Sequence, residues 1–245
     1  MRPLCEHRCM PTNPRPIVLV HGAWHGAWIW SDLITRLEAV GIPAQAIDLP
    51  GHGMSPLPPS DVNGDADALA RVAQRVGPDA IWVGHSYGGA VISAASALAP
   101  AAHLVYIAAF ALESRESVNG FLRAAPRHHV ELADAMQPGD EASTINPDAA
   151  GDLLYRGLDP ALIASHVTRL GPQPHATMTT PIEASGLGAV PSTYILCERD
   201  RCVHPEHQQI MAARCDHTIA VDEDHSPFLS APDTIVEILR ALATA

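Results

Sequence analysis

The chain has 245 residues, which is enough for one α/β domain with a small insertion. Its formal net charge of −12 argues against nucleic acid or an anionic membrane surface as a partner. All 15 basic residues are arginines, so chemistry that needs a lysine, such as a Schiff base or a Walker-type phosphate site, is excluded.

Short apolar runs alternate with amphipathic segments in the first half of the chain. Continuous apolar runs of four to six residues are typical of strands buried on both faces, and apolar stripes at helical spacing predict helices. The predicted order is strand 17–20, helix 31–40, strand 43–49, helix 65–76, strand 80–83, a helix of small residues over 89–99, and strand 103–108.

This regular alternation breaks after Phe110 and returns near residue 192. The segment between mixes short helical pieces with proline and glycine and shows no strand pattern, so we expect a helical cap. The helical pieces are 118–125, 129–136, 147–155 and 160–167, and the core resumes with strand 192–197, helix 205–213, strand 217–221 and helix 233–243. The predicted parts are a disordered tail (1–14), an α/β core (15–110 and 187–245) and the cap (111–186).

Strands that alternate with helices predict a mostly parallel sheet of six strands with helices on both faces. Ligands of such sheets bind at the carboxyl ends of the strands. The chemically notable residues all come just after a predicted strand, so we expect them at one end of the sheet. They are His21-Gly22-Ala23, Ser86, Asp200 and His225.

The pentapeptide Gly84-His85-Ser86-Tyr87-Gly88 lies between strand 80–83 and the helix that follows it. The G-x-S-x-G motif alone also occurs in structural loops, but a strand before it and a helix after it form the context of a nucleophile elbow. Such a strained turn holds the serine hydroxyl clear of the backbone. The residues two before and two after the serine must be small, because strand and helix nearly touch there. The helix N-terminus stabilises negative charge there. We therefore predict Ser86 as a nucleophile.

A serine hydroxyl needs a base within hydrogen-bond reach, and the base needs a carboxylate that fixes its tautomer. In this architecture the usual chain order is serine, acid, histidine. We predict Asp200, three residues past a strand, as the acid, with Glu198 as the alternative. His225 follows the last strand and is predicted as the base, whereas Asp222 and Asp224 are interpreted as solvated loop acids.

The oxyanion that develops during attack by a serine needs two backbone N–H donors. One should be that of Tyr87, directly after the nucleophile. The other should come from the loop after strand 17–20, where Gly22 lets the backbone approach closely. We predict the Ala23 N–H as the second donor, with the Trp24 N–H as the alternative.

Most of the 14 histidines are expected to be structural. The sequence HGAW occurs twice in tandem over 21–28, and we expect only the first copy to line the site, with His21 bracing its loop. His85 is expected to pack or bond locally rather than react. No H-E-x-x-H or similar ligand pair occurs, and the adjacent His128 and His129 would point apart on a helix, so we expect no metal and no cofactor.

Five cysteines form an odd set without paired C-x-x-C spacing, which is typical of reduced cytosolic thiols. Residues 1–16 lack the apolar core of a secretory signal, and Met10 is a candidate for the true start. No apolar run approaches the roughly 18 residues that span a membrane. We therefore expect a cytoplasmic protein, and the alanine-, proline- and arginine-rich composition suggests a bacterial source. The cysteines are Cys5, Cys9, Cys197, Cys202 and Cys215.

Motifs at five points, in the right order, resemble those of α/β-hydrolase-fold serine esterases. More narrowly, HGAWHGAWIW and DHSPFLSAP are similar to the branch that holds plant methyl esterases and hydroxynitrile lyases, with their bacterial esterase relatives. The resemblance implies an α/β-hydrolase fold without its usual first two strands, and a Ser86–Asp200–His225 triad. The motifs are His21-Gly22-Ala23, DLPGHG at 48–53, GHSYG at 84–88, Asp200, and DHSPFLSAP at 224–232.

The same branch contains lyases, and two positions separate this chain from them. The lyases carry a threonine after the oxyanion-loop histidine and a lysine after the catalytic histidine, where this chain has Gly22 and Ser226. Both departures favour hydrolysis. Haloalkane dehalogenases and epoxide hydrolases of the fold use an aspartate nucleophile, so Ser86 argues against both.

The sequence thus predicts a serine-dependent hydrolase of carboxylic esters that acts through an acyl-enzyme on a small to medium substrate. A lactone, thioester or amide hydrolase with the same triad is one alternative. A non-catalytic ligand receptor on the same fold is another, although a receptor has no physical need for all three triad residues. The cap (111–186) should line the pocket, and the oligomeric state is not readable.

Overall fold

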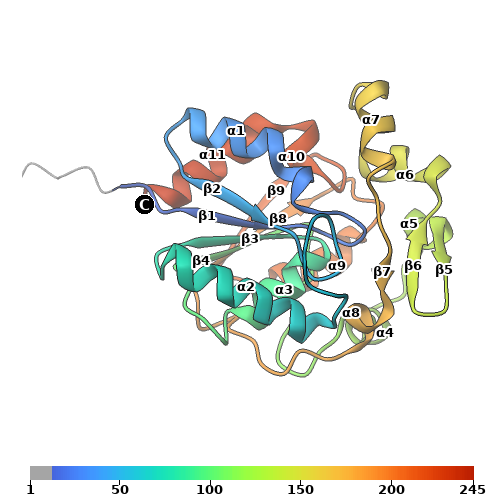
Figure 1. Cartoon of the computed structure of the whole chain (residues 1–245), viewed down its shortest axis with the longest axis horizontal. Coiled ribbons are helices and arrows are strands. Elements are labelled where there is room, and N and C mark those ends of the chain that lie inside the picture. The colour runs from blue at the N-terminus through green and yellow to red at the C-terminus, as the bar shows by residue number, and fades with distance from the viewer. Residues whose placement is uncertain (1–12) are drawn as a thin grey trace, which may run out of the picture.

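A six-stranded, entirely parallel sheet forms the centre of the computed structural model, which describes residues 13–245 (Figure 1). The strand order is β2-β1-β3-β4-β8-β9, which confirms the predicted sheet. The expected tail (1–14) lies outside the described residues except for its last two positions. The strands are β1 (Ile17–Val20), β2 (Ala44–Ile47), β3 (Ile81–His85), β4 (His103–Ile107), β8 (Ser192–Cys197) and β9 (His217–Val221).

Alternate residues of each central strand enter two different cores. In β1, Ile17 and Leu19 pack into the core under α1 and α11, whereas Val18 and Val20 pack into the core under α2 and α3. Burial on both faces explains why these strands are continuous apolar runs.

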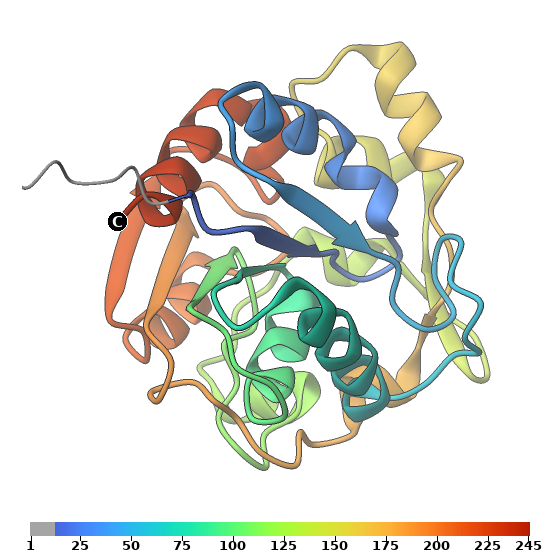
Figure 2. The ribbon, with the colours of Figure 1, turned by 60° about the vertical axis from the view of Figure 1, so that its left-hand side comes forward.

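Figure 2 shows the two helical layers on either side of the sheet. One layer holds η1 (Ala27–Trp30), α1 (Ser31–Ala39), α10 (Pro227–Ser230) and α11 (Pro232–Ala243); the other holds α2 (Val62–Val76), α3 (Tyr87–Ala95) and α9 (Pro205–Ala212).

The helix α2 begins three residues before its predicted start. The Asp61 side chain caps it by accepting hydrogen bonds from the N–H groups of Asn63 and Gly64, both at 3.0 Å. These bonds satisfy N–H groups of the first turn that have no partner within the helix. No helix in the described part of the chain is long and apolar enough to cross a membrane.

The segment between β4 and β8 contains the four predicted helical pieces and a small antiparallel sheet of order β5-β6-β7. The expectation that it contains no strand was wrong. The three strands are two to four residues long and largely polar, so they carry no readable period, and β7 pairs with β6 only through tertiary contact. The elements are α4 (Val118–Ala124), α5 (Glu131–Ala135), β5 (Met136–Pro138), β6 (Ala142–Ile145), α6 (Pro147–Leu154), α7 (Pro160–Val167), β7 (Gln173–Pro174) and α8 (His175–Thr179).

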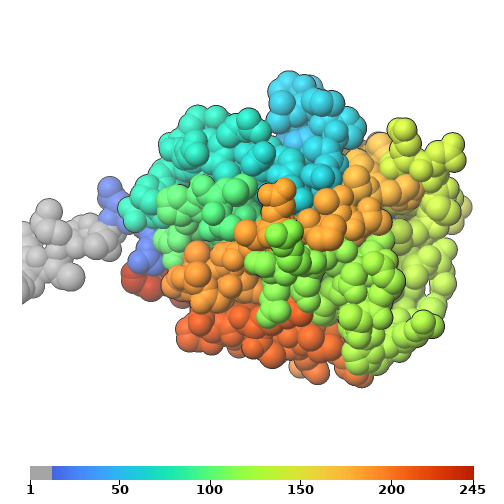
Figure 3. All heavy atoms as spheres, turned by 90° about the horizontal axis from the view of Figure 1, so that it is seen from below, coloured from blue at the N-terminus to red at the C-terminus, as the bar shows by residue number. Residues whose placement is uncertain are grey.

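This cap packs tightly against the later part of the chain. The space-filling view shows its green and yellow-green residues in contact with orange residues of the core (Figure 3). Several hydrogen bonds and ion pairs join these parts, and two of them come from α9 and the residues just after it. The His207 Nε2 on α9 donates to the Pro126 carbonyl at 2.7 Å, and Arg214 pairs with Glu116 at 2.6 Å. The three cysteines among the described residues, Cys197, Cys202 and Cys215, are free thiols, whereas Cys5 and Cys9 lie outside that range.

Candidate active site

Ser86 lies on a strained turn between β3 and α3. Its φ of 52° and ψ of −119° are unusual for a residue with a side chain, and such strain costs on the order of 1–3 kcal/mol. Three backbone hydrogen bonds hold the turn. The Ser86 N–H donates to the Ile107 carbonyl at 3.2 Å, and the Ser86 carbonyl accepts from Gly89 at 3.1 Å and Phe110 at 3.0 Å. The geometry is that of the predicted nucleophile elbow.

The glycines of the elbow are required by close backbone contacts. A Cβ on Gly84 would lie 2.5 Å from the Gly88 carbonyl oxygen, and a Cβ on Gly88 would lie 2.5 Å from the Val20 carbonyl oxygen. A Cβ on Gly22 would lie 3.0 Å from the Ser86 Cβ. Strand, helix and the loop after β1 therefore meet around Ser86, as the small residues of the motif predict.

Asp200 and His225 meet because β8 and β9, which they follow, are parallel neighbours. The His225 Nδ1 donates to the Asp200 Oδ2 at 2.8 Å, and both side chains are buried. The other carboxylate oxygen of Asp200 accepts the N–H groups of Cys202 at 2.7 Å and Val203 at 3.0 Å. With Nδ1 bonded to Asp200, Nε2 is the nitrogen of the His225 ring that has no hydrogen bond among the described residues.

Gln208 on α9 holds this acid in place, and nothing in the sequence pointed to it. The side chain is fully buried, and its Oε1 accepts the Cys197 N–H at 2.9 Å. Its Nε2 consequently faces the Asp200 Oδ2 and the Val203 carbonyl, both at 2.8 Å. The acid loop is thus fixed by a helical amide eight residues further along the chain.

The alternative acid, Glu198, is exposed. Of the two residues interpreted as solvated loop acids, Asp222 is exposed and pairs with Arg199 at 3.2 Å. For Asp224 that interpretation was wrong, because its side chain is half-buried and faces Arg201 at 3.5 Å. Within residues 13–245, Asp200 is the acidic residue whose side chain is hydrogen-bonded to the His225 ring.

His85 joins the elbow to the loop that carries His225. Its Nε2 donates to the His225 carbonyl at 2.9 Å, and the two ring centroids are 4.5 Å apart. Burial lowers the pKa of His85 well below its usual value, which keeps this ring neutral and agrees with the local role expected for it. Over the described part of the chain, Ser86 Oγ has no hydrogen bond. In unliganded enzymes the bond between nucleophile and base is often long.

The backbone N–H groups of Ala23 and Tyr87 have no acceptor among residues 13–245, and both residues line the same cavity as Ser86. The Trp24 N–H, the alternative donor, is occupied by the Gln173 Oε1 at 3.0 Å. Of the three cavity-lining residues Ala23, Trp24 and Tyr87, the two whose N–H groups stay unoccupied are therefore the two that the sequence singled out.

Two buried histidines brace the loop after β1. His21 donates from Nδ1 to the Gly22 carbonyl at 2.8 Å and accepts the Leu49 N–H on Nε2 at 3.1 Å. Burial lowers the pKa of His21 well below its usual value, so this ring also stays neutral.

His25 comes from the second HGAW copy, which was not expected to line the site. Its Nδ1 donates to the Ala23 carbonyl at 2.6 Å, and the Tyr155 hydroxyl donates to its Nε2 at 2.8 Å. Burial lowers the pKa of His25 to about 3. Ala23 and Trp24 of the first copy line the cavity, but the second copy supports them.

The cavity beside Ser86 has a volume of about 380 Å³, toward the lower end for small-molecule sites. Its wall is mostly apolar, and cap residues supply much of it. Another hollow, of about 500 Å³ along the edge of β2, has no serine, cysteine, histidine or carboxylate in its wall. The apolar wall of the Ser86 cavity includes Phe110, Val118, Leu122, Val130, Leu132 and Met178.

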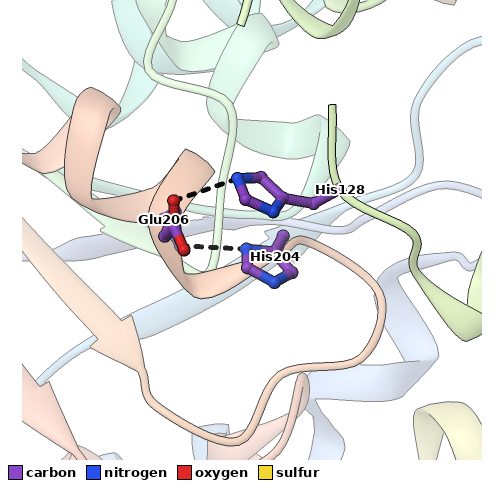
Figure 4. Close-up of side chains that lie close together, drawn as sticks. All are labelled: His128, His204 and Glu206. Atoms are coloured by element: carbon purple, nitrogen blue, oxygen red, sulfur yellow. Dashed lines mark hydrogen bonds and ion pairs between the residues drawn. The ribbon is translucent and has the colours of Figure 1, made fainter. Parts of the chain in front are cut away.

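His128, His204 and Glu206 lie close together and form a second group of side chains that could hold a metal ion (Figure 4), and His128 also lines the cavity. His128 Nε2 lies 3.0 Å from a Glu206 carboxylate oxygen, and the two imidazoles stack with centroids 3.9 Å apart and planes 5° apart. Because the lone pairs of stacked rings run parallel, they do not converge on one ion. The neighbouring His129 points elsewhere and pairs with Asp134 at 2.9 Å.

Asp200, Cys202 and His225 also offer three possible ligand atoms within 4.8 Å of one another. Burial raises the pKa of the Cys202 thiol well above its usual value, which disfavours the thiolate that binds metals. The Asp200 carboxylate already accepts four hydrogen bonds. The group therefore suits a hydrogen-bonded acid–base pair better than a metal ion.

Sequence comparison finds relatives along nearly the whole chain. The family model described as "Alpha/beta hydrolase family" matches residues 17–238. An "Alpha/beta hydrolase nvfD" of Aspergillus novofumigatus is 31% identical over 244 residues, which cover 93% of this chain and 96% of that protein. "Methylesterase 2" of Arabidopsis thaliana is 26% identical, with 92% of this chain and 95% of that protein covered.

Solved structures share the same fold. A pyrethroid hydrolase from Sphingobium faniae aligns with a TM-score of 0.78 at 24% identity, covering 94% of this chain and 98% of that one. Polyneuridine aldehyde esterase aligns with a TM-score of 0.79 at 20% identity, covering 94% and 99%. Both likenesses extend over the cap as well as the sheet.

Proposed function

The chain belongs to the alpha/beta hydrolase family, and from that premise we propose that it is a serine-dependent hydrolase of carboxylic esters. The observation that carries the proposal is the hydrogen-bonded pair of His225 and Asp200, which is tied through His85 to the strained elbow of Ser86. A serine hydroxyl that lines a cavity on a strained turn, an imidazole and a buried carboxylate are the parts of a catalytic triad.

In this mechanism Ser86 Oγ attacks the acyl carbon while His225 Nε2 takes the hydroxyl proton. Asp200 accepts a hydrogen bond from the Nδ1–H of His225 and stabilises the imidazolium that forms. The Ala23 and Tyr87 N–H groups donate to the oxyanion, and the intermediate collapses when His225 returns the proton to the leaving alcohol. Water, deprotonated by His225, then attacks the acyl-enzyme and releases the acid and Ser86.

The cavity supports a small to medium substrate. A volume of about 380 Å³ with an apolar wall suits a short acyl or alcohol group better than a long lipid chain. Proteins named methylesterase occur among the relatives, and that name denotes an ester substrate. We extend that substrate class to this chain. A separate cap (111–186) and a cytoplasmic location stay predictions from the sequence.

Hydrolysis of p-nitrophenyl esters from acetate to octanoate tests the proposal directly. Ser86→Ala should lower kcat/KM by at least about 10⁴-fold, because the remaining binding groups act without a nucleophile. Ser165→Ala, which removes an exposed hydroxyl from α7, is the matched control and should behave as wild type. Near-wild-type activity in Ser86→Ala would contradict the proposed nucleophile.

A serine-directed fluorophosphonate separates the remaining alternatives. Labelling of wild type but not of Ser86→Ala, without turnover of the esters, would indicate an active triad that takes a lactone, thioester or amide. A wild type that is neither labelled nor active would favour the non-catalytic receptor. If the esters are hydrolysed, the acyl chain length with the highest kcat/KM would indicate the size of the pocket.

A further inference from the structure

Three separate hydrogen bonds join the cap to Trp24, a residue of the loop after β1, which we call the oxyanion loop. Trp24 has a φ of 64°, a left-handed conformation that is uncommon for a bulky side chain. Its N–H donates to the Gln173 Oε1 at 3.0 Å, its carbonyl accepts the Gly171 N–H at 2.8 Å, and its indole N–H donates to the Ser143 carbonyl at 3.2 Å. Every polar group of Trp24 is thus bonded to the cap.

Gln173 on β7 is the centre of this contact, and it is fully buried. A backbone N–H only donates, so the atom facing Trp24 must be Oε1, and the His52 Nε2 lies 2.9 Å from the same oxygen. The Gln173 NH₂ group then donates to the Thr177 Oγ1 at 2.7 Å, and Thr177 donates to the Pro174 carbonyl at 2.6 Å. The network leaves one orientation for the amide.

These hydrogen bonds fix the orientation of peptide groups in the loop after β1. The Gly22 carbonyl is fixed by His21, and the peptide between Ala23 and Trp24 is fixed at both ends, by His25 and by Gln173. Within the described residues neither the Gly22 N–H nor the Ala23 N–H has an acceptor, and of these two residues Ala23 lines the cavity. By occupying the next N–H, Gln173 makes Ala23 the donor that faces the cavity.

We propose that Gln173 is a positioning residue for the oxyanion hole, so that the cap supplies part of the catalytic geometry as well as the pocket wall. This inference rests on the proposed function. Without an acceptor at residue 173, the Trp24 N–H and His52 lose their partner, and the left-handed turn loses one of its cap bonds. The Ala23 N–H then moves away from the place where the oxyanion forms. A shift of about 1 Å in such a group costs up to about 100-fold in rate.

The test is Gln173→Met, which keeps length and apolar volume but removes the acceptor. We expect kcat for the best p-nitrophenyl ester to fall between about 10- and 100-fold, with KM within about threefold of wild type. Affinity for a trifluoromethyl ketone, which forms an oxyanion adduct with the serine, should fall in parallel with kcat/KM. Affinity for the product acid should not change. Thr144→Val, an exposed change on the neighbouring β6, is the matched control and should leave all four quantities unchanged.

Thr177→Val is a milder second variant in case Gln173→Met does not fold. It leaves the Gln173 oxygen in place but removes the anchor of its NH₂ group, so kcat should fall less, by about three- to tenfold. The inference is overturned if folded Gln173→Met keeps kcat and ketone affinity within threefold of wild type. It is equally overturned if KM and product affinity worsen as much as kcat, because that indicates general damage to the pocket. An inactive wild type would instead contradict the proposed ester hydrolysis.

Discussion

Three buried, neutral histidines around the elbow should make this protein lose stability steeply in mild acid. Burial lowers the pKa values of His21 and His85 well below the usual 6.5, and that of His25 to about 3. In the unfolded chain each of these rings binds a proton near pH 6.5. Their contribution to stability is therefore complete above pH 6.5 and is lost as the pH falls toward the lowered values of the folded state.

The magnitude follows from the linkage between protonation and folding. Between pH 7.5 and pH 5.5, a histidine that stays neutral in the fold and titrates at 6.5 when unfolded costs about 1.4 kcal/mol. Three such residues together cost about 4 kcal/mol, a large share of the roughly 5–15 kcal/mol that stabilises a typical domain. Burial raises the pKa of Asp65, which acts in the opposite direction at lower pH, so the measurement stays at or above pH 5.5.

Urea unfolding at pH 7.5, 6.5 and 5.5 measures this loss for wild type and for His25→Asn. The asparagine amide can still donate to the Ala23 carbonyl, and it does not titrate. We expect wild type to lose at least about 4 kcal/mol over this range, since the pKa values of His103 and His166 are also lowered, and the variant to lose about 1.4 kcal/mol less. The exposed His129→Asn is the control and should show the wild-type loss. Equal losses in wild type and His25→Asn would refute the neutral state assigned to His25.

Two further variants probe the support of the site. Gln208→Leu removes a donor from Asp200 and leaves the buried Cys197 N–H without a partner, so the free energy of unfolding should fall by about 1–3 kcal/mol and kcat by about tenfold. Unchanged urea midpoints and kcat would show that the amide is dispensable. Gly88→Ala drives a Cβ to 2.5 Å from a β1 carbonyl and should cost about 2–3 kcal/mol, seen as a lower Tm. Gly171→Ala, whose Cβ would meet nothing within 4 Å, is its control, and equal Tm values would contradict the close contact at the elbow.

Local patterns in the sequence were enough to predict the sheet and its chemically active end. Strands buried on both faces are continuous apolar runs, and the elbow needs glycines where its backbone atoms touch. Because carboxyl ends of parallel strands share one edge, the positions of Ser86, Asp200 and His225 after their strands indicated that they would lie together. The order of strands along the sheet could be expected only through the family resemblance.

The support around those residues could not be read from the chain. Gln173 lies 149 residues from Trp24, and Tyr155 lies 130 residues from His25, and nothing local marks either pair. A buried glutamine can hold a distant loop only when folding brings it beside a backbone N–H that has no other acceptor. The cap strands were missed for the same reason, since β7 becomes a strand by pairing with β6.

The sequence by itself therefore determined the fold class, the candidate nucleophile, acid and base, and the strained turn, because each depends on short-range sterics or burial. Only the tertiary structure decided between the alternatives that the sequence left open, namely Asp200 over Glu198 as the partner of His225 and Ala23 over Trp24 as the unpaired N–H. It also decided which cap residue bonds to the loop after β1. Those outcomes depend on hydrogen bonds between segments that are distant in sequence. Their partners are chosen by packing, and no local pattern records that choice.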